Sequence, residues 1–136
     1  MNGKFHFVYN SAKYNETVAL YRDGLQLALL ASWDEGPEAR GSVFQAASGI
    51  IEVMAHPATK GHEWVVYSPD LPKGVGLAFE VENVEEWYQR VRERNLPIKT
   101  ELARFNWGQH GFAVLEPNGL VIFVYSTIPH EQASSS

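Results

Sequence analysis

The order of hydrophobic and polar positions predicts a strand, a helix and three further strands in the first half of the chain. An aromatic and β-branched run at residues 5–9 is typical of a strand. The helix is predicted from apolar side chains at spacings of four, three and four residues: Tyr14, Val18, Tyr21 and Leu25. Gly24 suits the C-cap of this helix, where positive φ is favoured. Further strands are predicted at residues 25–30, 42–46 and 50–55.

The second half of the chain repeats this order. Residues 75–81 alternate as a half-buried strand, Asn83 with Glu86 is typical of a helix N-terminus, and three strands follow at 96–102, 111–115 and 120–125. Matching elements lie about 70 residues apart, as in the pairs His6 with Gly76 and Glu52 with Phe123. The pattern therefore predicts an α+β fold in which two tandem βαβββ modules form a cupped mixed sheet with the helices outside.

The length and composition fit one compact domain that spans residues 1–136. The chain has a mass of 15.3 kDa, and 45% of its residues are hydrophobic. Within this domain we expect a first module at 4–56, a connector at 57–74, a second module at 75–126 and a flexible tail at 127–136.

Charge and composition exclude several classes of function. The absence of cysteine excludes disulfides, thiolate catalysis and zinc–thiolate sites. A net charge of −5 without a basic run argues against a nucleic-acid partner. The apolar runs are too short to span a membrane, and the first residues do not resemble a secretory signal, so we expect a cytoplasmic protein. Motifs of serine hydrolases, phosphate-binding loops and zincins do not occur.

The period of two along the strands places polar and aromatic side chains on the inner face. His6 and Glu52 are expected to face inward, where a carboxylate needs a partner. Two interpretations stand side by side: the two residues pair with each other as part of the structure, or they hold a ligand together. Phe123 and Tyr125 are expected to form an aromatic wall on the same side, which suits a planar ligand but is equally typical of core packing.

Two further candidates precede the wall in the sequence. Trp107 lies in a loop beside Gly108, where a ligand contact or a dimer contact is favoured over packing in the core. His110 is interpreted either as a polar contact at the rim of the cup or as a solvated loop histidine.

Several motifs, in this order and spacing, resemble the vicinal oxygen chelate superfamily of glyoxalases, bleomycin-resistance proteins and ring-cleaving dioxygenases. They are the strand with His6, the helix end at residues 21–25, the strand at 50–53 and the Glu-Pro-Asn-Gly turn before the last strand. The resemblance implies a metal site on the first and fourth strands of each half. The matching positions here are His6, Glu52, Gly76 and Phe123.

Only two of these four residues can ligate an ion, so we expect no metal cofactor. If a divalent metal is bound through His6 and Glu52, a loop residue has to complete the site, and the candidates are Gln45, Gln109 and His110.

Residues 106–112 are similar to a Pro-Trp-Gly-Arg-x-Phe motif of the bleomycin-resistance branch, with Asn106 and His110 as departures. The resemblance implies a metal-independent protein of antibiotic-resistance type that binds a small organic ligand, often as a homodimer. The acidic balance favours a cationic ligand, and the aromatic wall suits an aromatic one. No residue is assigned to catalysis. The alternative is a metal-dependent lyase, isomerase or dioxygenase that uses His6 and Glu52, and a third hypothesis is that the dimer surface itself is the function.

Overall fold

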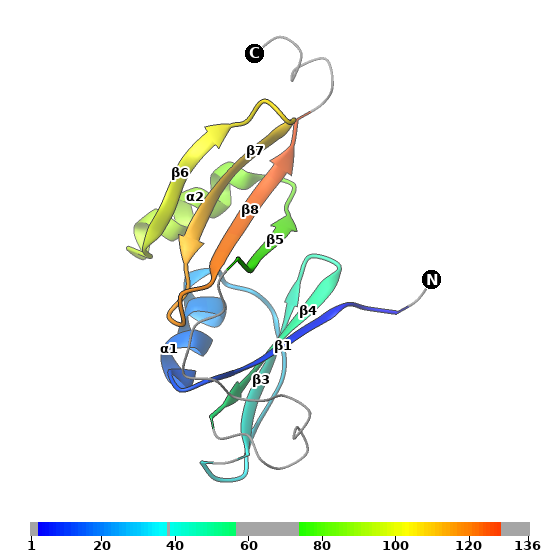
Figure 1. Ribbon diagram of the computed structural model, residues 1–136, viewed down its shortest axis with the longest axis vertical. Coiled ribbons are helices and arrows are strands. Elements are labelled where there is room, and N and C mark those ends of the chain that lie inside the picture. Colours follow the sequence, from blue (N-terminus) through cyan, green and yellow to red (C-terminus); the bar gives the residue numbers. More distant parts are fainter. Residues whose placement is uncertain (1–2, 38, 57–73, 129–136) are drawn as a thin grey trace. The chain divides into compact units, whose positions relative to one another are not determined.

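The computed structural model describes residues 3–37, 39–56 and 74–128, which fall into two compact units, Met1–Leu71 and Pro72–Ser136 (Figure 1). Each unit holds one four-stranded mixed sheet and one helical segment. The predicted α+β fold of two tandem βαβββ modules is confirmed. Most of the expected connector and the chain after residue 128 lie outside the described residues.

The first unit pairs its strands in the order β1-β4-β3-β2, with β1 parallel to β4 and the other neighbours antiparallel. The helical segment packs on one face, where the ring of Tyr21 lies 5.6 Å from that of Phe44 and its hydroxyl lies 2.8 Å from that of Tyr9. The elements of this unit are β1 (His6–Ser11), α1 (Tyr14–Ala19), η1 (Leu20–Gly24), β2 (Leu29–Asp34), β3 (Arg40–Ala46) and β4 (Gly49–Ala55).

The second unit has the same topology, in the order β5-β8-β7-β6 with β5 parallel to β8. Its helix packs against Phe112, whose ring lies 5.2 Å from that of Tyr88. The helix begins after Asn83, whose side chain accepts a 3.4 Å hydrogen bond from the Glu86 N–H, as the capping motif predicts. The elements are β5 (Gly76–Glu80), α2 (Val84–Glu93), β6 (Ile98–Arg104), β7 (Gln109–Leu115) and β8 (Val121–Thr127).

The strand predicted at 25–30 begins later than expected, because the sheet strand β2 starts at Leu29. The helix ends instead in a π-helical turn, in which the Leu25 N–H donates to the Leu20 carbonyl at 2.8 Å. Leu25 and Leu27 are buried as the chain leaves this turn, with Gln26 at positive φ between them. Their apolar character reflects packing against the helix end rather than strand pairing.

The last strand extends beyond its predicted end at residue 125 and into the expected tail. Strand β8 runs to Thr127, and Ile128 is buried with its N–H donating to the Gly108 carbonyl at 2.8 Å. Among the described residues, no helix has the length and apolar character needed to cross a membrane.

Candidate functional site

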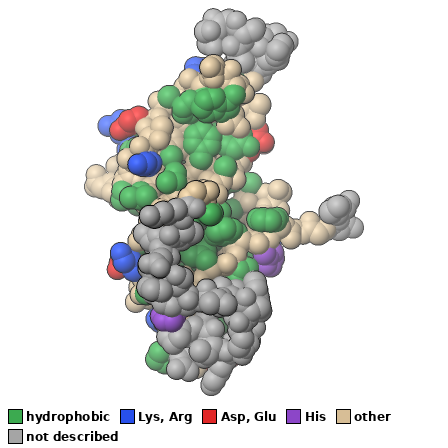
Figure 2. All heavy atoms as spheres, in the orientation of Figure 1, with side chains coloured by type: hydrophobic (Ala, Val, Ile, Leu, Met, Phe, Trp, Pro, Cys, Tyr) green, Lys and Arg blue, Asp and Glu red, His purple; other side chains and the backbone are tan. Residues whose placement is uncertain are grey.

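Four aromatic rings form a continuous row on one face of the second sheet. Side chains alternate along β8, so Ile122 and Val124 are fully buried while Phe123 and Tyr125 lie on the opposite face and are half-buried. Figure 2 shows hydrophobic side chains gathered over the strands of this unit. We call Phe105, Trp107, Phe123 and Tyr125 the aromatic row.

Each ring of the aromatic row contacts the next one. Trp107 stacks on Phe105 with ring centroids 4.5 Å apart, Phe105 meets Phe123 edge-on at 5.8 Å, and Phe123 stacks on Tyr125 at 5.6 Å. Trp107 is 63% exposed, and its indole N–H donates to the Gln109 side chain at 2.8 Å. The outer end of the row is therefore held in place yet open to a ligand.

Gly111 provides the space that the row occupies. It pairs with Tyr125 across β7 and β8, and a Cβ atom at this position would lie 2.7 Å from Phe123 Cζ and 2.8 Å from the Val124 carbonyl. A side chain there is incompatible with the present position of the rings. Glycine at position 111 therefore allows the ring of Phe123 on β8 to lie over the neighbouring strand β7.

In the first unit, His6 and Glu52 lie close together on the sheet face that the helix does not cover. Glu52 pairs with Val8 on β1 and with Val43 on β3, so its side chain emerges among aliphatic neighbours and is only 12% exposed. His6, 47% exposed, places Nδ1 4.0 Å from Glu52 Oε1. This is long for a hydrogen bond, and the contact becomes an ion pair when the imidazole is protonated.

The same face of the first sheet carries Trp33 above Gly41. A Cβ atom at Gly41 would overlap Cζ2 of Trp33, so the indole occupies the space above this glycine. Gly41 and Gly111 are 70 residues apart and occupy equivalent third strands of the two modules. In both modules, glycine on this strand makes room for an aromatic ring from a neighbouring strand.

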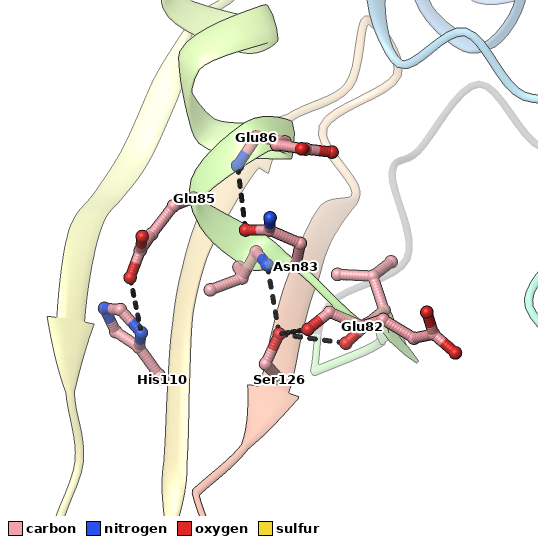
Figure 3. Close-up of polar contacts among 8 residues, drawn as sticks. Glu82, Asn83, Glu85, Glu86, His110 and Ser126 are labelled. Atoms are coloured by element: carbon pink, nitrogen blue, oxygen red, sulfur yellow. Dashed lines mark hydrogen bonds and ion pairs between the residues drawn. The ribbon is translucent and has the colours of Figure 1, made fainter.

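His110 lies on the other face of the second sheet from the aromatic row. Its Nδ1 is 3.9 Å from Glu85 Oε1 on α2, and its pairing partner Ser126 accepts a hydrogen bond from the Val84 N–H at 3.0 Å (Figure 3). Within its own unit, His110 therefore lies on the helix-covered side of the sheet, with its side chain 16% exposed. His110 shares a face with Phe112 because the two residues are separated by a single position on the strand.

The family comparison matches nearly the whole chain. Residues 5–124 match the model of the glyoxalase/bleomycin resistance protein/dioxygenase superfamily. The chain belongs to this superfamily. No curated protein sequence matches it significantly.

Solved structures from the superfamily and related proteins share the fold. The chain is similar to TioX from Micromonospora sp. ML1, at a TM-score of 0.74 and 15% identity over 93% of this chain and 100% of that one. A superfamily protein from Nocardioides has a TM-score of 0.71 and 16% identity, covering 96% and 86%. A protein of unknown function from Agrobacterium tumefaciens str. C58 has a TM-score of 0.70 and 22% identity, covering 94% and 97%.

The strand register places the four positions of the expected metal site equivalently in the two modules. His6 stands two residues before the partner of Glu52 on β1, and Gly76 stands two residues before the partner of Phe123 on β5. The first module thus offers an imidazole and a carboxylate, whereas the second offers a hydrogen atom and a phenyl ring. This donor set does not fit an ion that both modules ligate.

The three candidates expected to complete a metal site make other contacts in this structure. The Gln45 amide donates to the carbonyls of Ala47 and Gly49, Gln109 accepts from Trp107, and His110 faces α2. Within the described residues, no group of three or more His, Asp and Glu side chains is placed to hold a metal ion.

The structure brings the predicted site residues into two groups and leaves one apart. His6 contacts Glu52, and Trp107 joins Phe123 and Tyr125 through Phe105. His110 lies apart from both groups, on the helix side beside Glu85. Sequence reasoning missed Phe105, which links the row. Its place in the sequence could have indicated this role. Phe105 lies two residues before Trp107 in the loop between β6 and β7, and residues two positions apart tend to lie on the same side of the chain.

Proposed function

We propose that the protein binds a small organic molecule with a planar aromatic part, and that it does so without a metal ion, in the manner of the ligand-sequestering bleomycin-resistance branch. The observation that carries the proposal is the aromatic row, four contacting rings on a sheet face left free by the helix of its own unit. Aromatic surfaces of this size that remain partly exposed are typical of binding sites.

Stacking supplies the affinity in this proposal. A ligand ring placed against Trp107 or Phe123 removes apolar surface from water and adds about 0.5–1.5 kcal/mol for each aromatic pair. The faces of the rings also attract a positive charge. A planar cation therefore fits the row better than a planar anion, in agreement with the net charge of −5.

Titration with proflavine, a planar cation, and with naphthalene sulfonate, a planar anion, tests this proposal. We expect saturable quenching of tryptophan fluorescence that is stronger for the cation and unchanged by EDTA. Replacing Trp107 or Phe123 with alanine is expected to weaken binding about tenfold, which corresponds to one lost aromatic pair.

Phe5→Ala is the matched control, because Phe5 is 76% exposed and lies in the other unit, outside the row. It is expected to bind proflavine like the wild type. Equal affinities of the Trp107, Phe123 and Phe5 variants, or no saturable binding at all, would contradict the proposal.

A second candidate function is a metal-dependent lyase, isomerase or dioxygenase, which the proximity of His6 and Glu52 favours. In this candidate the two side chains ligate a divalent ion, or Glu52 acts as a general base. Metal analysis of protein purified without chelator, followed by titration with nickel, zinc and iron(II), distinguishes the candidates. A stoichiometric ion that is lost in His6→Ala would favour the enzyme over the metal-independent binding protein.

A further inference from the structure

We propose that the first unit carries a second ligand site, a groove for a small carboxylate or phosphate anion between the helix and strands β2 and β3. The groove has a volume of about 460 Å³, within the range of small-molecule sites. Ser42 lines it and shares the helix-covered face of β3, whereas Glu52 emerges from the opposite face of the sheet. The groove thus opens on the face opposite to that of Glu52, although Trp33, which lies above Gly41, also lines it.

The helix supplies one wall of the groove. Tyr14, Val18 and Arg22 all line it and are spaced four residues apart, which places them along one side of the helix. Arg22 belongs to the π-helical turn η1, a local widening that is frequent at functional sites. The Tyr14 ring is held against the sheet by a hydrogen bond between its hydroxyl and that of Ser42, which lie 2.7 Å apart.

Arg40 supplies a positive charge to the groove, opposite Asp34, its cross-strand partner on β2. Its guanidinium lies over the Tyr14 ring, 4.8 Å from the centroid, and within the described residues it forms neither an ion pair nor a hydrogen bond. Its Nε is buried without an acceptor. A partly buried guanidinium in this state favours a ligand that brings an acceptor with negative charge.

The other charged groups at the groove leave Arg40 as the recognition element. Arg22 is engaged by Asp23 through two hydrogen bonds of 2.9 and 3.0 Å. Asp34 also lines the groove, and one of its oxygens accepts a hydrogen bond from the Gly36 N–H at 3.2 Å. Because the planar fork of arginine matches carboxylate and phosphate oxygens, the ligand class is a small carboxylate or phosphate compound.

Calorimetric titration of the full chain with acetate, benzoate and inorganic phosphate, and with ethylammonium as the cationic comparison, tests this inference. We expect at least one anion to bind saturably at millimolar concentration, to lose affinity with rising salt, and to exceed ethylammonium. The stronger of benzoate and phosphate identifies the class of oxyanion. Arg40→Gln is expected to weaken binding about tenfold or more, as the loss of a charged hydrogen bond requires.

Arg92→Gln is the matched control, since Arg92 also lies over a tyrosine ring, 5.7 Å from the centroid of Tyr88, but in the other unit. It is expected to leave anion binding unchanged, as is Trp107→Ala, which separates this site from the aromatic row. If Arg40→Gln does not fold, Arg40→Lys keeps the charge without the fork and is expected to bind measurably more weakly. Equal binding by the Arg40 variants and the wild type, or no saturable anion binding, overturns the inference.

Discussion

Replacing Gly111 with alanine is expected to destabilise the protein and to disturb the aromatic row together. The new Cβ atom would lie 2.7 Å from Phe123 Cζ, 2.8 Å from the Val124 carbonyl and 2.9 Å from Tyr125 Cβ. A ring can rotate away from such a contact, but the carbonyl belongs to the neighbouring strand and moves only with the sheet. Overpacking of this kind typically costs about 1–3 kcal/mol, which lowers the melting midpoint by about 4 °C for each kcal/mol.

Urea unfolding measures this loss, and Gly76→Ala provides the control within the same sheet. A Cβ at Gly76 would meet only the Val121 carbonyl at 3.4 Å, an ordinary contact, so this variant is expected to be neutral or more stable by about 0.5 kcal/mol. Proflavine affinity is expected to fall in Gly111→Ala and to persist in Gly76→Ala. If the two variants unfold at the same urea concentration, the steric reasoning about Gly111 is refuted.

Three further predictions follow from other parts of the structure. Gly41→Ala is expected to cost less than Gly111→Ala and to shift the tryptophan emission, because the three nearest atoms all belong to the ring of Trp33 on edge strand β2, which can move outward. Glu116→Ala is expected to cost about 1–3 kcal/mol in urea unfolding, because its buried carboxylate accepts backbone N–H groups of the following turn; an unchanged midpoint would contradict this. The hydrogen bond from the Tyr88 hydroxyl to Glu101 raises the pKa of Tyr88 above about 10, so its contribution to stability is present below that pH and is lost as the pH rises further. Absorbance titration of the wild type against Glu101→Gln checks this sign, and the variant is expected to ionise at lower pH.

The repeat and the sheet faces were predictable from the sequence because both depend on short periods. Alternation along β8 assigned Phe123 to one face and Val124 to the other, and the spacing near 70 residues identified equivalent positions in the two modules. The start of β2 was not predictable in this way. Leu25 and Leu27 are buried by the helix end rather than by a strand, and the hydrophobic pattern alone does not distinguish these environments.

The placement of His110 shows a related limit. His110 and Phe112 are two residues apart, so a strand through both places them on the same face. The predicted strand began at Gly111, however, whereas β7 begins at Gln109. The contacts made by Phe105 and Arg40 depend on side chains distant in the sequence, Phe123 in one case and Tyr14 in the other. No local period encodes such contacts, which arise when the sheet and helix are assembled.

The two modules share topology and register while their open faces differ in chemistry. At equivalent positions the first has an imidazole and a carboxylate, and the second has a glycine and a phenyl ring that extends over Gly111. Because backbone pairing and the helix-facing core maintain the module, the residues of the open face can change without loss of the fold. In the function we propose, donors in only one module favour binding by stacking over binding through a metal ion. A variant that restores donors at Gly76 and Phe123 would therefore be expected to lose proflavine binding even if it gained a metal.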